Sequence, residues 1–317
     1  MPEPVIAVVI PAYRAEETIA AVVGGLPATV RYVVVVDDAS PDATADVVRG
    51  LADPRVHLVR LDSNRGVGAA TIAGYDAAVS LGAEIVVKMD ADDQMDPRHL
   101  PRLVRPIVRG LADYTKGNRF LHSEELRTMP RGRRAASAGL SFFTKLASGY
   151  WAVFDPANGY TALHASLVPE LDRSRLADGY FFETSMLLEL GRLRAVVQDV
   201  AIPARYRGER SSFSSRRAAG EFPPRLLSAT WRRIRRQYFV QDFTPVSLFL
   251  VVGALFLLFG AAWGAYHWAE SIRLGVPATT GTVMLAVVPV IVGVQLLLQA
   301  IAQDIGNVPT RPIHDET

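Results

Sequence analysis

The sequence predicts an α/β domain built on a mostly parallel sheet, followed by a membrane-bound C-terminal part. Two observations support this prediction. Over roughly the first hundred residues, short β-branched runs alternate with helical segments through short links, which is typical of a right-handed, doubly wound sheet. In the last quarter of the chain, two apolar segments of about 20 residues contain no charged residue, and each is long enough as a helix to cross a bilayer.

The composition narrows the class of protein. Of the 317 residues, 50% are hydrophobic, a high share for a water-soluble protein that points to membrane spans. The formal net charge of +2 gives no overall signal for a polyanion, so we expect no nucleic-acid partner. The absence of cysteine excludes disulfides, thiolate nucleophiles and cysteine-based metal sites. We expect no signal peptide, because no basic stretch followed by a long apolar run opens the sequence.

Four short runs rich in valine and isoleucine are predicted strands, at residues 5–10, 32–36, 56–59 and 85–89. Helices are predicted over 16–26 and 66–81, and another is predicted to begin with Ser40 as N-cap and Pro41 as its first residue. Polar clusters follow the first, second and fourth strands. Because ligands bind beyond the carboxyl ends of strands in such sheets, this placement indicates a site.

The fourth predicted strand ends in a cluster of acids. Asp90 and Asp92 are spaced D-x-D, so that in a turn both carboxylates can face one divalent cation. Asp96 is predicted to cap a helix that Pro97 opens. An isolated D-x-D is more often a solvated acidic turn, and the position of this one at the end of a buried strand favours the metal site.

The chain is less regular after residue 113. A strand and turn are expected over 113–119. Apolar residues at helical spacing over 140–154 indicate either a core helix or one that dips into a membrane interface. A turn-rich patch follows at 155–160, and the polar, basic stretch 205–215 is expected to form a mobile loop.

A basic amphipathic segment precedes the apolar spans. Over residues 223–242, one face carries Leu227, Trp231, Ile234 and Tyr238, and arginines lie largely off it. This pattern is typical of a helix in the plane of the lipid headgroups, although a solvated helix on the preceding domain is the alternative.

The two uncharged spans cover residues 246–265 and 283–302. As helices, each reaches about 30 Å, the thickness of one hydrocarbon core, and a buried soluble hairpin is the alternative. The arginines before the first span are expected to stay cytoplasmic, and two spans return the tail to the same side. We therefore expect a multi-pass protein of the inner (plasma) membrane with its site facing the cytoplasm.

Seven patches in order carry a family resemblance. Four of them resemble family 2 glycosyltransferases of the GT-A fold: Ile10-Pro11-Ala12-Tyr13, Val36-Asp37-Asp38-Ala39-Ser40, Asn64-Arg65-Gly66-Val67-Gly68-Ala69-Ala70 and Asp90-Ala91-Asp92-Asp93-Gln94. The other three resemble the dolichol-phosphate mannose synthase and polyprenyl-phosphate glycosyltransferase branch: Asp155 with Asn158-Gly159-Tyr160, Phe182-Glu183, and Arg207-Gly208-Glu209-Arg210-Ser211. The two C-terminal spans look like those of the bacterial polyprenyl-phosphate members.

The resemblance implies four parts. Residues 1–222 would form a cytoplasmic GT-A glycosyltransferase domain and residues 223–243 an amphipathic juxtamembrane helix. Residues 244–304 would form a two-helix transmembrane hairpin and residues 305–317 a cytoplasmic tail.

The resemblance also implies a nucleotide-sugar donor, either a UDP- or a GDP-sugar. The residues expected to hold it are Pro11, Ala12, Tyr13, Glu16, Asp37, Asp38, Gly66, Gly68, Asp90, Ala91, Asp92 and Arg207. The family often has a glutamate at position 15; here Ala15 stands there and Glu16 follows. Asp37 and Asp38 could instead cap a helix, and Arg207 could instead be a surface arginine without a ligand.

A divalent cation, Mg²⁺ or Mn²⁺, is implied at Asp90, Asp92 and Gln94. It would neutralise the charge that develops on the departing nucleoside diphosphate. Arg207 would close over that diphosphate.

The implied acceptor is a polyprenyl phosphate, such as undecaprenyl or decaprenyl phosphate. Its phosphate, with a second pKa of about 6, is largely dianionic at pH 7 and needs no general base, so one displacement would invert the anomeric carbon. Arg119 and Arg133 match arginines that would hold it, Ser137 fits the same pattern, and Arg134 is an alternative register.

The catalytic set expected from the resemblance is Asp92, Asp155, Glu183 and Arg207. Asp155 and Glu183 are expected to orient sugar hydroxyls or the arginines, with a purely structural role as the alternative.

Three other functions compete with this one. A lipid acceptor with a hydroxyl group, such as diacylglycerol or ceramide, would require a base at Asp155 or Glu183. A non-catalytic, membrane-anchored nucleotide-sugar binder would not need the acids. A processive polysaccharide synthase should carry Q-x-x-R-W, which this sequence lacks. The donor sugar and the oligomeric state, a homo-oligomer included, stay open.

Overall fold

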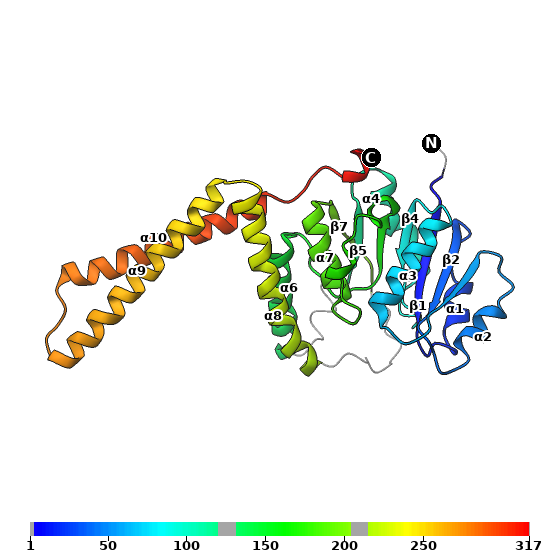
Figure 1. Cartoon of the computed structure of the whole chain (residues 1–317), viewed down its shortest axis with the longest axis horizontal. Helices are drawn as coiled ribbons and strands as arrows, with labels where there is room; N and C mark the ends of the chain where they lie inside the picture. Colours follow the sequence, from blue (N-terminus) through cyan, green and yellow to red (C-terminus); the bar gives the residue numbers. More distant parts are fainter. Residues whose placement is uncertain (1–2, 120–130, 204–214, 317) are drawn as a thin grey trace. The chain divides into compact units, whose positions relative to one another are not determined.

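The computed structural model describes residues 3–119, 131–203 and 215–316 (Figure 1). The chain divides into two compact units. The N-terminal unit comprises Met1–Ala229 and Pro309–Thr317, and the helical-hairpin unit comprises Thr230–Val308.

A seven-stranded sheet forms the centre of the N-terminal unit, with strand order β3-β2-β1-β4-β6-β5-β7. The strands are β1 (Ile6–Ala12), β2 (Val30–Asp37), β3 (Val56–Arg60), β4 (Ile85–Lys88), β5 (Tyr114–Asn118), β6 (Thr161–His164) and β7 (Val197–Ala201). Among these described strands only β6 runs against its neighbours. The predicted mostly parallel α/β sheet is therefore confirmed, with β6 and β7 added to the strands expected from the sequence.

The helices of the N-terminal unit mostly follow strands. They are α1 (Ile19–Gly24), α2 (Thr44–Arg49), α3 (Val67–Ser80), α4 (Leu100–Val108), α6 (Arg131–Ser148), α7 (Phe182–Leu193) and most of α8 (Ser215–Arg235), with short 3-10 turns η1 (Pro97–His99), η2 (Ala165–Leu167), η3 (Arg173–Arg175) and η5 (Ile313–Glu316).

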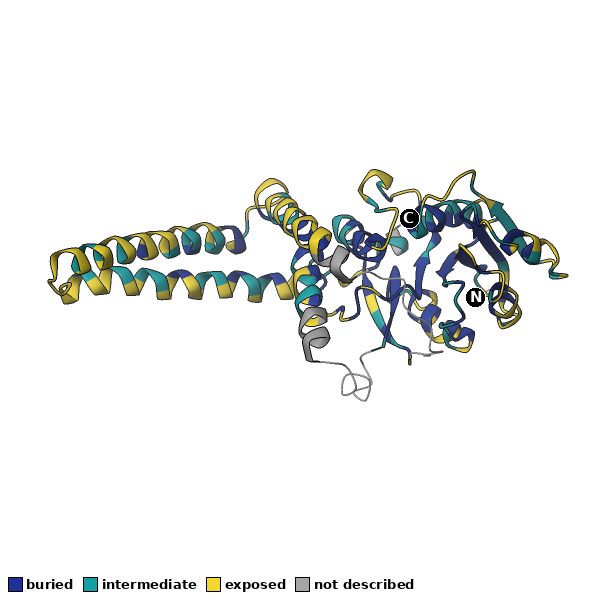
Figure 2. Cartoon of the chain, turned by 90° about the horizontal axis from the view of Figure 1, so that it is seen from below, coloured by how far each residue is buried: buried dark blue, intermediate teal, exposed yellow. Residues whose placement is uncertain are grey.

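Helices cover both faces of the sheet, whose central strands are buried (Figure 2). Val8 and Ile10 of β1 belong to a hydrophobic cluster with residues of α1 and α4. Val9 faces the opposite way, because successive strand residues alternate. There α3 packs so closely that a Cβ on Gly74 would lie 2.2 Å from Val9 Cγ1. This packing fixes the ends of β1, β2 and β4 side by side.

The helix after β2 begins later than predicted. Ser40 and Pro41 lie in a turn, and α2 begins at Thr44. The backbone N–H of Ser40 donates to Asp37 Oδ1 (2.9 Å), and that of Thr44 donates to Asp42 Oδ1 (3.3 Å). Short acidic side chains that bond the nearby backbone favour a turn over a helix, so the predicted N-cap is wrong.

The acidic segment after β4 ends as predicted. Asp96 caps the next turn by accepting from the backbone N–H of Arg98 (3.0 Å), and Pro97 is its first residue. The turn is the 3-10 turn η1, which leads directly into α4.

Helix α6 shows the core packing expected for the apolar segment 140–154, while its contact with a membrane interface stays a prediction. Ala147, and Tyr150 beyond the helix, are buried in the core. Phe142 and Phe143 are exposed, as is Phe154. One side of this segment therefore packs inward and another presents aromatic rings outward.

Helix α8 carries most of the predicted amphipathic segment and continues into a π-helical turn, η4 (Arg236–Val240). Leu227 and Trp231 are exposed, as a face directed at lipid would be. Tyr238 departs from that expected face because it is buried. The buried side of α8 in the N-terminal unit is instead formed by Phe222 and Leu226, which pack against α6 and α7.

The helical-hairpin unit contains α9 (Pro245–Leu274) and α10 (Thr280–Gly306), both long and apolar enough to cross a membrane. They include both predicted spans. Glycines let the two helices approach closely. A Cβ on Gly260 would lie 2.6 Å from the carbonyl oxygen of Ala286, and one on Gly293 would lie 2.7 Å from the nitrogen of Leu257.

A polar cluster closes the base of the hairpin. Both carboxylate oxygens of Asp304 accept from Arg233, each at 2.8 Å. The Tyr238 hydroxyl also donates to Asp304, and the Tyr238 carbonyl accepts from Ser247. Burial, together with the bond to Asp304, raises the pKa of Tyr238 to about 12. The end of α8 and both hairpin helices are thus joined.

The C-terminal tail belongs to the N-terminal unit. Asp113, a buried residue just before β5, accepts backbone N–H bonds from Ile313 (3.1 Å) and His314 (3.0 Å), and from Val196 (2.7 Å). The His314 ring also bonds Asp113 (2.6 Å) and stacks on His164 at a centroid distance of 4.3 Å. The segment after α10 is therefore attached to the same unit as the sheet.

Candidate active site

The carboxyl ends of three neighbouring strands bring the first polar patches together. β1 lies between β2 and β4, and Ala12 is in register with Asp37. The backbone N–H of Asp38 donates to the carbonyl of Ala12 (2.9 Å). The residues following β4 lie beside this edge. The positions expected to bind the donor therefore share one edge of the sheet.

Asp37 offers a buried acceptor atom. Its Oδ1 accepts from Ser40, as described above. Its Oδ2 lies 3.3 Å from Arg60 Nε but accepts no hydrogen bond from any described residue. Buried carboxylate oxygens normally have a donor, so this atom is suited to a ligand N–H or hydroxyl.

Other residues expected to bind the nucleoside also contact the protein itself. Asp38 accepts from the backbone N–H groups of Arg65 (2.7 Å) and Gly66 (2.8 Å), which fixes the turn before α3. Glu16 accepts from the backbone of Ala43 (2.8 Å). Pro11 and Ala12 are buried, and Tyr13 is exposed, with the Arg14 guanidinium 5.4 Å from its ring centroid.

The nucleotide contact expected of Gly66 and Gly68 stays a prediction, and both glycines also allow a close approach within the protein. Gly66 has φ +93°, a conformation that favours glycine. A Cβ there would lie 2.5 Å from the carbonyl oxygen of Asp178, and one on Gly68 would lie 2.1 Å from that of Ala177. The backbone of residues 177–179 lies beside these glycines, so a side chain at either position would clash with it.

The acidic turn after β4 is held by local bonds. Asp92 Oδ1 accepts from the backbone N–H of Gln94 (3.1 Å), and Asp93 has φ +56°. The carbonyl of Ala91 accepts from the Thr18 hydroxyl (2.6 Å). Within the described residues, no three acidic or histidine side chains are arranged to hold a metal ion. Carboxylate and amide oxygens are nevertheless the ligand type that Mg²⁺ and Mn²⁺ prefer.

Lys88 is the residue at the centre of the donor side. It is fully buried at the end of β4, with its Nζ 2.6 Å from Asp90 Oδ1 and 3.1 Å from Glu183 Oε1. Burial alone would lower the pKa of Lys88, but the two carboxylates outweigh it and raise the pKa. The ammonium therefore stays charged and joins the D-x-D motif to the first turn of α7.

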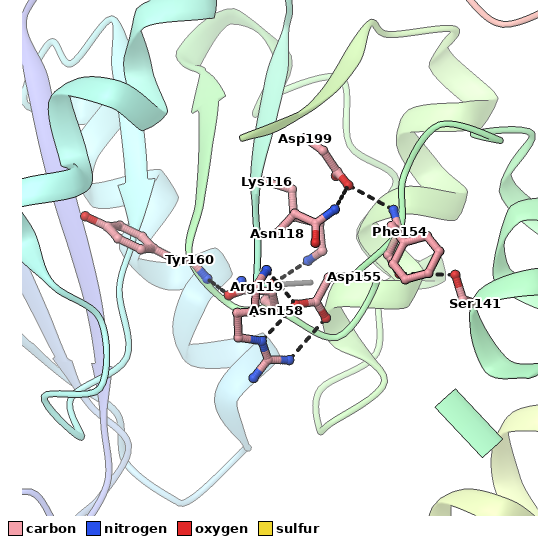
Figure 3. A network of polar contacts seen from close by, with 9 residues as sticks. All are labelled: Lys116, Asn118, Arg119, Ser141, Phe154, Asp155, Asn158, Tyr160 and Asp199. Carbon is pink, nitrogen blue, oxygen red and sulfur yellow. Dashed lines mark hydrogen bonds and ion pairs between the residues drawn. The ribbon is translucent and has the colours of Figure 1, made fainter. Parts of the chain in front are cut away.

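Arg119 and Asp155 form the centre of the other side, shown in Figure 3. Arg119 Nε lies 2.8 Å from Asp155 Oδ2, and its Nη2 lies 3.1 Å from Oδ1. Asp155 is buried, whereas about a third of the Arg119 side chain is exposed. A planar guanidinium suits bidentate binding of a phosphate as well as of a carboxylate.

The loop from Phe154 to Tyr160 is attached at several points (Figure 3). Asp199 Oδ2 accepts from the backbone of Phe154 (2.9 Å) and from Asn118 Nδ2 (2.6 Å). The carbonyl of Asn158 accepts from Lys116 Nζ, and its side chain accepts from the backbone of Tyr160 (3.0 Å).

These buried groups are electrostatically coupled. Burial lowers the pKa of Lys116 to about 8, an effect that Glu183 and Asp155 partly offset. Burial raises the pKa of Asp199, and its hydrogen bonds partly offset that shift.

Gly159 connects the two sides. A Cβ on Gly159 would lie 2.7 Å from both Asp90 Oδ2 and Lys88 Nζ. The loop that holds Arg119 through Asp155 therefore also lies against the D-x-D motif. This contact explains the glycine at position 159, because a side chain there would clash with Asp90 and Lys88.

Several expected site residues cannot be placed. Arg207 lies outside the described residues, and so do the side chains of Arg133, Arg134 and Ser137, which belong to the first turns of α6. Conversely, Lys88, Lys116 and Asp199 are not singled out by the sequence patterns. Charged residues inside short apolar strands are the signal that could have found the two lysines.

Comparison with known proteins identifies the family. The sequence profile of glycosyl transferase family 2 matches residues 7–171, just over half of the chain. The chain belongs to this family. The glycosyltransferase class expected from the seven patches is therefore confirmed.

Two curated relatives of this glycosyltransferase are similar over most of their own length. A UDP-N-acetylglucosamine–dolichyl-phosphate N-acetylglucosaminyltransferase from Methanococcus voltae is 32% identical over 57% of this chain and 77% of its own. An undecaprenyl-phosphate mannosyltransferase from Micrococcus luteus is 32% identical over 61% of this chain and 81% of its own.

Among solved structures, glucosyl-3-phosphoglycerate synthase from Mycobacterium tuberculosis, in complex with Mn²⁺, UDP and glucosyl-3-phosphoglycerate, superposes with a TM-score of 0.52. It is 20% identical and the match covers 73% of this chain and 80% of that one. The glycosyltransferase shares that fold, which agrees with the expected GT-A architecture.

Proposed function

We propose that this glycosyltransferase moves a sugar from a UDP- or GDP-sugar to a polyprenyl phosphate, such as undecaprenyl or decaprenyl phosphate, with inversion at the anomeric carbon. The observation that carries the proposal is the Phe154–Tyr160 loop, which bears Asp155 against Arg119 and Gly159 against Asp90. One loop thereby joins a cationic group suited to a phosphate acceptor to the acids of the donor side. The relatives named above, with polyprenyl-type phosphates in their names, support the acceptor class.

The donor nucleoside would lie at the ends of β1 and β2. The unbonded, buried Oδ2 of Asp37 would accept from a base N–H or a ribose hydroxyl. Asp38 and Glu16 would act indirectly, by holding the turns beside α3 and α2. Pro11, Ala12 and the exposed Tyr13 would form the wall of this part of the site.

Asp90, Asp92 and Gln94 would hold Mg²⁺ or Mn²⁺ together with the donor diphosphate. A divalent cation, when bound, neutralises the charge of the leaving diphosphate. Asp90 fits this task because its side chain is partly exposed and its Oδ2 accepts no hydrogen bond from the described residues. Arg207 is kept as a proposed partner of the diphosphate.

The transfer step needs no protein base. The acceptor phosphate is already anionic, so its oxygen forms the new bond to the anomeric carbon while the bond to the departing diphosphate oxygen breaks. Arg119, with Arg133 and Ser137 as further proposed contacts, would hold that phosphate close to an anionic donor. Asp155 and Glu183 are bonded to Arg119 and Lys88, which favours a role in orientation over proton abstraction.

We further propose that α9 and α10 anchor the protein in the plasma membrane, with residues 1–222 as a cytoplasmic catalytic domain. A polyprenyl chain leaves the bilayer only at a cost of about 0.8 kcal/mol per CH₂, so the site must work at the headgroup plane. The exposed rings of Phe142, Phe143 and Trp231 are suited to that plane.

The proposal is tested with the full chain in detergent. The protein is incubated with undecaprenyl phosphate, Mn²⁺ or Mg²⁺ and a panel of nucleotide sugars, and the organic phase is analysed by mass spectrometry. We expect a glycosyl phospholipid with one donor, lost with chelator and in the Asp92→Asn variant. Transfer that survives both treatments would contradict the metal site, and absence of product with every donor would contradict the proposed acceptor.

A further inference from the structure

Lys88 is a charged residue in a place where lysine is rarely found. It is the last residue of β4 and its side chain is 1% exposed. Burying an ammonium is unfavourable unless it is paired with opposite charge. The chain has only three lysines, so this one stands out against a sequence in which arginine carries nearly all positive charge.

Two carboxylates from different elements share the Lys88 ammonium. Asp90 follows β4 by two residues, and Glu183 lies in the first turn of α7. The Nζ–Oδ1 distance to Asp90 is 2.6 Å and the Nζ–Oε1 distance to Glu183 is 3.1 Å. One cation against two anions leaves the group with a formal charge of −1, which suits a neighbouring cation.

The pairing leaves the two oxygens of Asp90 in different situations. Oδ1 accepts from Lys88, whereas Oδ2 accepts no hydrogen bond from the described residues. Oδ2 lies against Gly159, where any Cβ would come within 2.7 Å of it. The lysine therefore fixes the rotation of the carboxylate, and the glycine keeps its second oxygen uncovered.

We propose that Lys88 is a positioning residue for the donor half of the site: it holds the Asp90 carboxylate so that Oδ2 faces the donor's divalent cation, and it ties this orientation to Glu183 on α7. The inference rests on the proposed function, since it concerns the same site. It adds that cation affinity depends on a residue that does not itself contact the cation or the donor. The conservative Lys88→Arg variant retains a positive charge and is expected to keep part of the effect.

The test measures the Mn²⁺ affinity of the detergent-purified full chain by titration calorimetry, with UDP or GDP present. We expect Lys88→Met to weaken Mn²⁺ binding about 10- to 100-fold, the usual cost of losing an outer-shell partner. Lys88→Arg should recover part of the loss. In assays with the active donor, the Mn²⁺ concentration for half-maximal rate should rise in parallel, while KM for the lipid acceptor stays within about twofold.

Arg55→Met is the matched control, because it also removes a cation paired with a carboxylate, that of Asp53 at 2.8 Å, but at the amino ends of β2 and β3. Its Mn²⁺ affinity should equal that of the unmodified chain. If Lys88→Met folds poorly, the double variant Lys88→Met/Glu183→Gln removes one of the unpaired carboxylates and should regain melting temperature while Mn²⁺ binding stays weak.

The outcomes separate this inference from the proposed function. Equal Mn²⁺ affinity in the unmodified chain and in a folded Lys88→Met variant would overturn the positioning role alone. Full recovery of Mn²⁺ affinity in the double variant would also overturn it, because stability would then explain the loss. An unmodified chain that binds no Mn²⁺ with either nucleotide would overturn both the positioning role and the proposed metal site.

Discussion

At the scale of single residues, the ion pair of Arg119 and Asp155 is the contact on which acceptor binding would depend. Asp155 is buried and orients a guanidinium that is itself partly exposed. The same arrangement recurs at Lys88 and Asp90 on the donor side. In both cases a buried group fixes the side chain that would meet a ligand, which is how a precise polar site is held in place.

Asp155→Asn should weaken the hold on Arg119 without removing any group that touches the acceptor. We expect kcat/KM for polyprenyl phosphate to fall about 10- to 100-fold, equivalent to roughly 1.4–2.7 kcal/mol. Asp172→Asn, in the exposed pair of Arg175 and Asp172, is the matched control and should change little. Steady-state kinetics with the identified donor measures both, and an unchanged Asp155→Asn enzyme would remove Arg119 from the acceptor site.

Lys116 should make stability depend on pH in the alkaline range. Burial lowers its pKa to about 8, below the ordinary lysine value. The carboxylates of Glu183, Asp155 and Asp199 partly offset this shift, and the charge of Lys88 adds to it. The unfolded chain therefore binds the proton more tightly, and folding should become more favourable as pH rises from about 8 to 10.5.

Comparison with Lys116→Met isolates this effect from other groups that titrate at high pH. At pH 7 the charged lysine costs on the order of 3 kcal/mol, so the variant should melt at least as high as the unmodified chain. The advantage should shrink as pH approaches 10.5. Melting temperatures at several pH values measure it, and a difference that does not change with pH would show that the pKa of Lys116 is not lowered in the folded protein.

At the scale of elements, the sequence patterns predicted the bounds of the strands more accurately than those of the segments that connect them. β1 to β5 were all expected within two residues, because β-branched runs bounded by polar residues are distinctive. The helix after β2 was misplaced because Asp37 and Asp42 bond the backbone locally. β6 escaped detection because its four residues, Thr161–His164, contain no valine or isoleucine and so form no β-branched run.

The hairpin offers an element-scale prediction. Gly260→Ala would place a Cβ 2.6 Å from the carbonyl oxygen of Ala286, so the helices must separate or shift. Overpacking of this kind costs about 1–3 kcal/mol. Gly281→Ala is the control, since nothing lies within 4 Å of a Cβ there. The melting temperature in detergent should fall for the first variant only; an equal response would mean that α9 and α10 do not pack through Gly260.

At the scale of the whole molecule, the order of the motifs along the chain predicted the family and the class of reaction. The first four motifs each follow one of the parallel strands β1 to β4, which end at the same edge. The donor-side acids could be named in advance because D-x-D after an apolar strand is a local pattern. The lysines were not predicted, because the patterns used do not report a single charge inside an apolar strand. The contact of Lys88 with Glu183, about a hundred residues away in the chain, has no local signal at all. The attachment of the tail through His314 and Asp113 joins residues that are 201 positions apart in the chain.

That attachment makes a prediction about membrane topology. The tail and the sheet belong to one unit, so both ends of the hairpin should lie on the same side of the membrane. Because the chain has no cysteine, single cysteines report their own side cleanly. Ser63→Cys and Thr310→Cys should react with an impermeant maleimide in inverted vesicles, and Ala278→Cys only in intact cells. Labelling of Thr310→Cys and Ser63→Cys from opposite sides would contradict a two-span anchor.

The proposed acceptor atom is a phosphate oxygen, and the most direct measurement compares two lipids that differ only there. Undecaprenyl phosphate and undecaprenol would be offered at equal concentration with the identified donor, and the glycosylated lipid quantified by mass spectrometry. We expect product from the phosphate alone, because Arg119 is proposed to hold an anion and the acids that could serve as a base are bonded to Arg119 and Lys88. Glycosylation of undecaprenol would contradict this account and show that a base acts in the site.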